Sequence, residues 1–190
     1  RDTGLSYFPG LFLGMFVGGV LSMITAAVLG LGILGLRGHY FAIGTLGLGI
    51  AAGEIAAGWD YIGAGSGMVP PLYPGEVGSR EQFFAYAFLV LAAICFLVLK
   101  RLYAGQFGLA LNAIRDDEGK ATAMGFNTTY YKTAAWMLAA LFTGFAGGAY
   151  SLFNTFIDPQ TAYNGAWNVE LIAMALLGGS GTVAGPIIGA

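Results

Sequence analysis

Residues 9–36 of this chain read PGLFLGMFVGGVLSMITAAVLGLGILGL, without one charged side chain. The stretch is longer than the about 20 apolar residues that a helix needs to cross the hydrocarbon core of a bilayer. Because that core offers no water to unpaired backbone groups, an apolar run of this length must be helical there. The stretch therefore predicts a transmembrane helix, and it decides the class of fold.

Four further apolar stretches follow, at residues 40–58, 83–99, 133–156 and 169–190. Only 9% of the 190 residues are charged, whereas soluble domains carry roughly 25%. We therefore expect an all-α protein, a polytopic transmembrane helical bundle of about five spans that forms one transmembrane domain over residues 1–190. Because the chain begins at Arg1 rather than Met and stops at Ala190 inside an apolar stretch, we also expect it to be truncated at one or both ends.

The basic residues near the ends of the stretches predict the orientation, because cytoplasmic loops carry an excess of Lys and Arg. One side carries Arg1 and Arg80; the other carries Arg37, Lys100, Arg101, Arg115, Lys120 and Lys132. Residues 100–132, called the charged loop below, are therefore expected in the cytoplasm, as one or two short helices at the membrane surface. The amino end is expected outside, together with the Pro-rich loop Trp59–Glu81 and the acidic residues Asp60, Glu76 and Asp158.

Glycine accounts for 32 of the 190 residues, and much of it recurs at every fourth position. The first stretch has Gly10, Gly14, Gly18, Ser22, Ala26 and Gly30; the second has Gly49, Gly53 and Ala57; the fourth has Ala140, Gly144 and Gly148. Small residues at this spacing let the backbones of membrane helices approach closely. The pattern predicts a tightly packed bundle, which a channel, a transporter or a membrane enzyme could equally use.

Several functions are excluded by what the sequence lacks. A net charge of −2 without a basic cluster excludes nucleic acid as a partner. Cys95 is the only cysteine, so no intrachain disulfide can form. His39 has no second ligand at metal-binding spacing, so no metal site is expected. Ser66 lacks the surroundings of a nucleophile elbow, and no phosphate-binding loop ends in Gly-Lys, so we expect neither an enzyme nor a nucleotide site on this chain.

Polar residues inside or beside the apolar stretches are the candidates for a translocation path. A carboxylate inside a membrane costs about 2.5–3.5 kcal/mol on insertion scales, so it normally faces the bundle or a water path. Glu54 fits a structural hydrogen bond as well as it fits a path. Glu170 also fits a helix-start carboxylate that the helix dipole favours. The candidate path residues are Glu54, Ser66, Asn168 and Glu170.

The charged loop has its own helical signals. Asp116 and Lys120 are spaced as an i,i+4 ion pair, Gly125 is expected to end a helix, and Asn127 to cap the next. Four apolar residues can supply a small apolar face: Ala113, Ile114, Ala121 and Met124. From these residues alone, a solvated connector and a docking element are equally good interpretations.

The loop resembles the cytoplasmic loop of branched-chain amino acid ABC transporter permeases. The likeness lies in Ala113–Glu118 (AIRDDE), Ala123–Asn127 (AMGFN) and Tyr131–Lys132, and it continues through Ala139–Tyr150, Val169–Glu170 and Leu177–Pro186 (LGGSGTVAGP). Upstream, Arg37–Leu46 and Gly63–Met68 are similar to that family as well. The resemblance covers about residues 30–190.

The resemblance implies a subunit of a bacterial inner-membrane importer, embedded in lipid and built with a second permease subunit, two ATP-binding subunits and an extracytoplasmic substrate-binding protein. ATP and Mg would then be bound by the partner ATPase, with no cofactor on this chain. The coupling residues that it implies are Arg115, Asp116, Asp117, Glu118, Ala121, Met124 and Gly125. One departure is that Gly125 comes one position later than the importer pattern Glu-Ala-Ala-x-x-x-Gly requires, which leaves open which residue takes the Glu position.

The resemblance also implies the cargo, namely leucine, isoleucine and valine moved by alternating access. Related permeases carry urea or short amides, which is the first alternative. A proton-coupled secondary transporter that uses Glu54 or Glu170 is the second.

Overall fold

The computed structural model describes residues 7–36, 39–75, 77–179 and 181–190. Two basic residues used to predict the orientation, Arg1 and Arg37, and the acidic residue Glu76 of the predicted outer side lie outside these described residues. The described chain divides into two compact units, each taken by itself below: residues 1–37 with 71–154, and residues 38–70 with 155–190. In both units the described secondary structure is helical, apart from one isolated bridge, and this confirms the all-α class.

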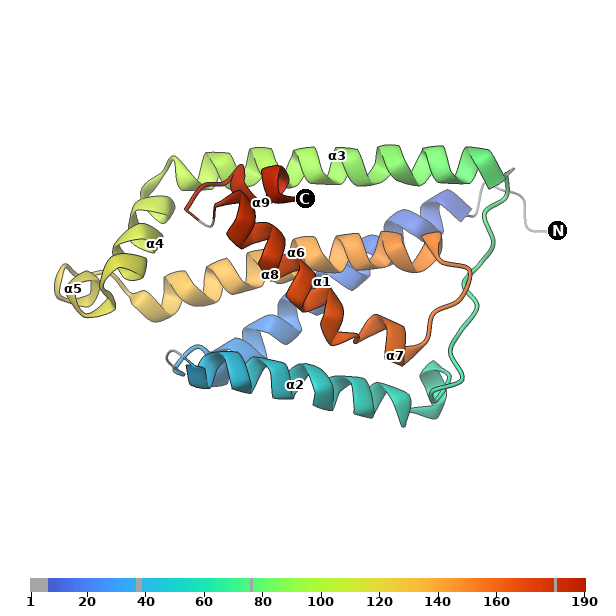
Figure 1. The fold of residues 1–190 in the computed structure, drawn as a ribbon, viewed down its shortest axis with the longest axis horizontal. Helices are drawn as coiled ribbons and strands as arrows, with labels where there is room; N and C mark the ends of the chain where they lie inside the picture. Colours follow the sequence, from blue (N-terminus) through green and yellow to red (C-terminus); the bar gives the residue numbers. More distant parts are fainter. Residues whose placement is uncertain (1–6, 37–38, 76, 180) are drawn as a thin grey trace. The chain divides into compact units, whose positions relative to one another are not determined.

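The described part of the first unit contains three long helices and two short ones. The long helices are α1 (Tyr7–Ile33), α3 (Val77–Tyr103) and α6 (Thr128–Phe153). The short ones, α4 (Gln106–Asp116) and α5 (Glu118–Ala123), lie between α3 and α6. Figure 1 shows α1 crossing α6, against which α3 also packs. The charged loop therefore forms two short helices, as its sequence predicts.

Glycines bring the backbones of α1 and α6 into contact. A Cβ built on Gly144 would lie 2.7 Å from Gly19 Cα and 2.8 Å from the Gly18 carbonyl oxygen. One built on Gly148 would lie 2.9 Å from Met15 Cα. These distances are far shorter than the about 3.5–4.0 Å of an ordinary carbon contact. The predicted close packing is confirmed between these two helices.

The small-residue pattern does not pack along its whole length. A Cβ on Gly10 or Gly14, in the first turns of α1, would meet no atom within 4 Å. The same holds for Gly49 in the second unit, whereas Gly53 lies against the Tyr163 side chain. Spacing alone therefore overstates how many of these glycines are needed for close approach.

The second unit contains α2 (His39–Ala57), the 3-10 turn η1 (Asp60–Ile62), α7 (Pro159–Ala162), α8 (Gly165–Gly178) and α9 (Gly185–Gly189). Met68 and Ile157 exchange backbone hydrogen bonds of 2.7 and 2.9 Å, which joins the loop after η1 to the segment before α7. At Gly67 the backbone takes a φ of +78°, and a Cβ there would lie 2.7 Å from the Ile157 carbonyl oxygen. Only a glycine fits this junction.

Within the described residues, four helices are long and apolar enough to cross a membrane: Tyr7–Ile33, His39–Ala57, Gly78–Tyr103 and Thr128–Phe153. They confirm the first four predicted helices to within a few residues at each end. The prediction of one continuous helix over residues 169–190 is wrong. In the described structure α8 ends at Gly178, because Gly179 takes a φ of +97°, and α9 follows as a separate short helix.

The two short helices α8 and α9 pack against each other backbone to backbone. Cβ atoms built on Gly178, Gly185 or Gly189 would overlap backbone atoms across this contact. The apolar composition of residues 169–190 predicts one span, but its glycines serve a helical hairpin instead.

Candidate functional site

The charged loop holds the candidate coupling residues, and one residue sets its geometry. Asp117 ends α4, since its backbone N–H donates to the Ala113 carbonyl at 3.0 Å, and it also caps α5, since its side chain accepts from the Lys120 N–H at 3.0 Å. Its backbone is extended, with φ −161° and ψ 108°. A single non-helical residue therefore separates two helices that each have a satisfied end.

The same hydrogen bonds fix the charge of Asp117. The hydrogen bond from the Lys120 backbone N–H lowers the pKa of the Asp117 carboxyl below its ordinary value, and the hydrogen bond from the Lys120 side chain lowers it further, by a smaller amount. An ionised carboxylate is the better acceptor for the orphan N–H groups of a helix start. The cap is thus ionised at neutral pH.

The other end of α5 closes as the sequence predicts. The Gly125 N–H donates to the Thr122 carbonyl at 3.0 Å and the Phe126 N–H to the Ala121 carbonyl at 3.1 Å, while Gly125 takes a φ of +91°. This is the pattern with which a glycine terminates a helix. Asn127 then caps α6 by accepting from the Tyr130 N–H at 3.1 Å, which confirms its predicted role.

The predicted ion pair between Asp116 and Lys120 is wrong. Asp116 pairs with Arg115 at 3.2 Å, and Lys120 pairs with Asp117 at 3.3 Å. The i,i+4 rule needs one continuous helix, and the break at Asp117 places the two predicted partners on different helices.

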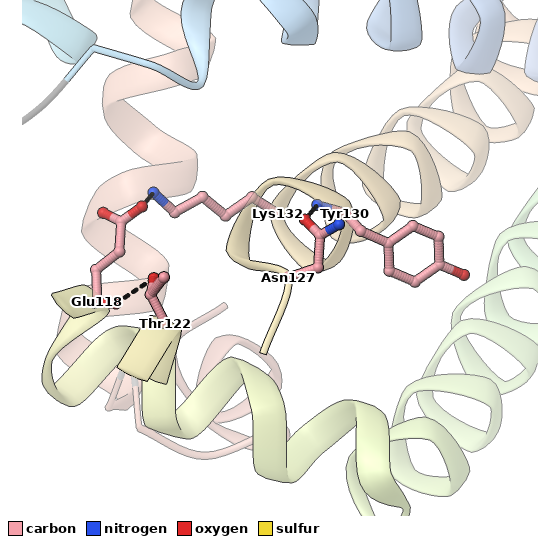
Figure 2. A network of polar contacts seen from close by, with 5 residues as sticks. All are labelled: Glu118, Thr122, Asn127, Tyr130 and Lys132. Atoms are coloured by element: carbon pink, nitrogen blue, oxygen red, sulfur yellow. Dashed lines mark hydrogen bonds and ion pairs between the residues drawn. The ribbon is translucent and has the colours of Figure 1, made fainter. Parts of the chain in front are cut away.

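A third ion pair joins α5 to α6. The Lys132 ammonium lies 2.6 Å from Glu118 Oε1, and their side chains are only 25% and 30% exposed (Figure 2). Thr122, one turn further along α5, donates its hydroxyl to the Glu118 carbonyl at 2.9 Å. The sequence uses Lys132 for the predicted orientation and for the family resemblance, but it does not predict this pair, because the two residues are too far apart along the chain for any local spacing rule.

The seven predicted coupling residues divide by exposure. Arg115, Asp116 and Met124 are well exposed, with Met124 at 73%. Ala121 is buried, at 1%, so it packs α5 in place and offers no surface to a partner. The exposed residues, here called the exposed rim, therefore lie at the carboxyl ends of both short helices: Arg115 and Asp116 end α4, and Met124 directly follows α5.

The four candidate path residues all belong to the second unit. Glu54 lies in the last turn of α2, and Ser66 lies in the glycine-rich loop, where its hydroxyl donates to the Gly63 carbonyl. Asn168 and Glu170 lie in α8, and all four are exposed. Asn164 caps α8 by accepting from the Ala166 N–H at 3.0 Å, so Glu170 lies beyond the helix start at which the sequence placed it. Their role as a path stays a prediction.

Among the residues that the structure describes, no three His, Cys, Asp or Glu side chains gather closely enough to hold a metal ion. The charged loop has a defined arrangement of its own. It consists of an exposed short helix, two caps that fix its ends, and one shielded ion pair that joins it to a helix long enough to cross a membrane.

Comparison with known proteins shows which family this chain belongs to. Residues 3–190 match the family described as branched-chain amino acid transport system, permease component. The chain is 28% identical to the high-affinity branched-chain amino acid transport system permease protein LivM of Salmonella typhimurium and 27% identical to that of Escherichia coli; each match covers 93% of this chain and 48% of the relative. It is 26% identical to the probable branched-chain amino acid transport permease protein LivM of Methanocaldococcus jannaschii, over 93% of this chain and 50% of the relative.

The chain thus spans about half the length of these curated relatives. No solved structure gives a significant match.

Proposed function

Since this chain belongs to the family of branched-chain amino acid permease components, we propose that it is a membrane subunit of an ATP-driven importer for leucine, isoleucine and valine. The proposed importer also contains a second permease subunit, two ATP-binding subunits and an extracytoplasmic binding protein, in a bacterial plasma membrane. ATP is hydrolysed on the partner subunits, and this chain forms part of the path.

The observation that carries the proposal is the construction of α5. An exposed methionine, Met124, directly follows it, and hydrogen bonds with the flanking residues Asp117, Gly125 and Phe126 close its two ends. A short helix of this kind can enter a groove on a partner without unravelling. A solvated connector needs neither the caps nor the ion pair to α6.

The proposed mechanism is alternating access. Closure of the ATP-binding subunits displaces α5, the displacement passes to α6, and the path opens first outward and then inward. A ligand can shift such an equilibrium only by binding one state better than the other. In this scheme the differential contact is made by the exposed rim around Met124.

Reconstitution with its partners in proteoliposomes tests the proposal. We expect uptake of labelled leucine to require ATP, the ATP-binding subunits and the binding protein together. Uptake driven by a proton gradient without the ATPase would instead support a secondary transporter that uses Glu54 or Glu170. Calorimetry of the partner binding protein with leucine, urea and short amides decides the cargo.

A variant pair locates the contact with the ATPase. We expect Met124→Ser to lower leucine uptake per ATP hydrolysed, because it removes an apolar side chain from the tip of α5. Leu109→Ser is the matched control, since Leu109 is 68% exposed but lies on α4. Equal losses in the two variants would contradict a contact made by α5.

A further inference from the structure

We propose that Lys132 is a positioning residue that, through its ion pair with Glu118, makes α5, α6 and α1 move as one body. The inference rests on the proposed function, because it names the connection by which a push on α5 reaches the membrane helices. Three features of the structure carry it.

The first feature is the shielding of the ion pair. The pairs Arg115–Asp116 and Lys120–Asp117 join near neighbours, and each has at least one side chain that is 60% exposed or more. Glu118 and Lys132 are less than a third exposed and lie 2.6 Å apart. Exposed pairs contribute little because water and salt screen them, whereas partial burial strengthens the attraction between two charges. Of these three pairs, only this one joins α5 to α6.

The second feature is the position of the two residues. Glu118 is the first residue of α5, directly after its cap, and Lys132 lies in the second turn of α6. The covalent connection leaves the opposite end of α5, through Gly125 to Asn127. The helix is therefore attached to α6 at both of its ends, by the chain at one and by the ion pair at the other. Without the ion pair, the amino end of α5 would still continue through Asp117 into α4, but it would lose this direct attachment to α6.

The aromatic contacts nearby do not replace this attachment. Tyr131 packs on Phe107 of α4 at 5.8 Å and on Phe126 of the turn at 6.1 Å between ring centroids. These contacts hold α4 and the turn to α6. None of these three rings belongs to α5.

The third feature is the contact between α6 and α1. Backbone atoms of the two helices touch at Gly144 and Gly148, so they cannot slide past each other without separating. Packed interiors pass small displacements on because they deform little. A displacement delivered at Glu118 thus reaches Lys132, then α6, then α1.

The test uses the complete transporter in proteoliposomes and measures leucine taken up per ATP hydrolysed. We expect Lys132→Gln and Glu118→Gln each to lower this ratio by about 5-fold or more, the range typical of coupling between two sites. The double variant should be no worse than either single one, because the second substitution removes a pair that is already broken. Lys132→Arg should keep most of the ratio. Lys100→Gln, which removes an exposed charge elsewhere in the charged loop, should leave it unchanged.

A measurement on the purified chain separates coupling from misfolding. In Lys132→Gln we expect hydrogen exchange to speed up at the amides of α5, with those in the middle of α1 and α6 unchanged. Exchange that is unchanged in α5 would overturn the inference.

The outcomes separate the two proposals. A wild-type complex with ATP-driven uptake, together with variants of unchanged ratio or with losses that multiply in the double variant, would overturn this inference alone. A wild-type complex that takes up leucine without its ATPase would overturn the proposed function, and the exchange experiment would still decide whether Lys132 holds α5.

Discussion

Gly144 offers the sharpest test of how the first unit is held together. In Gly144→Ala the new methyl group would lie 2.7 Å from Gly19 Cα and 2.8 Å from the Gly18 carbonyl oxygen. A third neighbour, Ser22 Oγ at 2.7 Å, can rotate away, but the two backbone atoms cannot. The helices must therefore move apart locally by about 1 Å to restore an ordinary carbon contact of about 3.5–4.0 Å.

The cost follows from that separation. A gap of about 0.5–1 Å forfeits a quarter to a half of the dispersion energy of each contact that it opens. Overpacking of this kind typically costs about 1–3 kcal/mol. Replacing Gly by Ala also favours the helix by about 1 kcal/mol.

A matched control cancels this gain in helix propensity. Gly147 lies in the same helix, and a methyl group added there would meet no atom within 4 Å, so Gly147→Ala gains the propensity without the clash. We expect Gly144→Ala to be less stable than Gly147→Ala by about 1–3 kcal/mol.

A tryptophan at the contact between α1 and α6 can serve as a fluorescence probe of their separation. Of the three tryptophans, Trp136 lies on α6 beside Gly30 of α1, with its Cδ1 3.2 Å from where a Gly30 Cβ would lie. In a background of Trp59→Phe and Trp167→Phe, its fluorescence reports the separation of α1 from α6 during unfolding in mixed micelles with increasing SDS. Free energies of unfolding for the two variants within about 0.5 kcal/mol of each other, the usual scatter of neutral substitutions, would refute the claim that backbone contact holds these helices together.

Three further predictions concern the turns and the cap. Gly67→Ala and Gly65→Ala share the cost of a positive φ, but a Cβ at Gly65 would only make an ordinary contact with the Ala57 carbonyl oxygen at 3.5 Å, whereas one at Gly67 would lie 2.7 Å from the Ile157 carbonyl oxygen and too close to the Phe156 ring. Thermal unfolding in detergent should therefore show Gly67→Ala less stable than Gly65→Ala by about 1–3 kcal/mol. Because the folded pKa of Asp117 is lowered, its stabilisation of α5 is present above the ordinary carboxyl pKa and lost as the pH falls through the folded value. Hydrogen-exchange protection of α5, corrected for intrinsic rates, should therefore fall more steeply in acid in the wild type than in Asp117→Asn, whose amide still caps. Gly125→Ala should cost about 1–2 kcal/mol of backbone strain alone, since nothing lies within 4 Å, and Gly125→Asn should cost less; equal exchange rates in α5 for both would contradict this.

The sequence predicts best what depends on local composition. The first four long helices follow from apolar runs, and the termini of α5 and α6 follow from Gly125 and Asn127, because capping is decided by neighbours within a few residues. The family resemblance, stated from motifs in the charged loop and beyond, is confirmed by the match over residues 3–190.

Prediction from the sequence fails where contacts between residues far apart in the chain decide the structure. The pairing of Glu118 with Lys132 depends on the turn that returns the chain from α5 to α6, and no spacing rule reaches across it. Residues 169–190 are apolar enough for one span, yet the contact of Gly178 with the glycines of α9 makes them a hairpin. Glycine composition is ambiguous here, because the same residue permits close helix packing and ends helices.

The bridge between Met68 and Ile157 has a consequence for biogenesis. The chain leaves the second unit after residue 70 and returns to it only at residue 155, having built α3 to α6 in between. On the ribosome, the loop around Gly67 is therefore made long before the extended segment that it needs as a partner. Loop closure over so long an intervening chain is entropically unfavourable until the intervening helices have folded. Assembly of the second unit is thus a late event in synthesis. Helix α2 is made early but gains its contacts with this unit only after the segment around Ile157 has been synthesised.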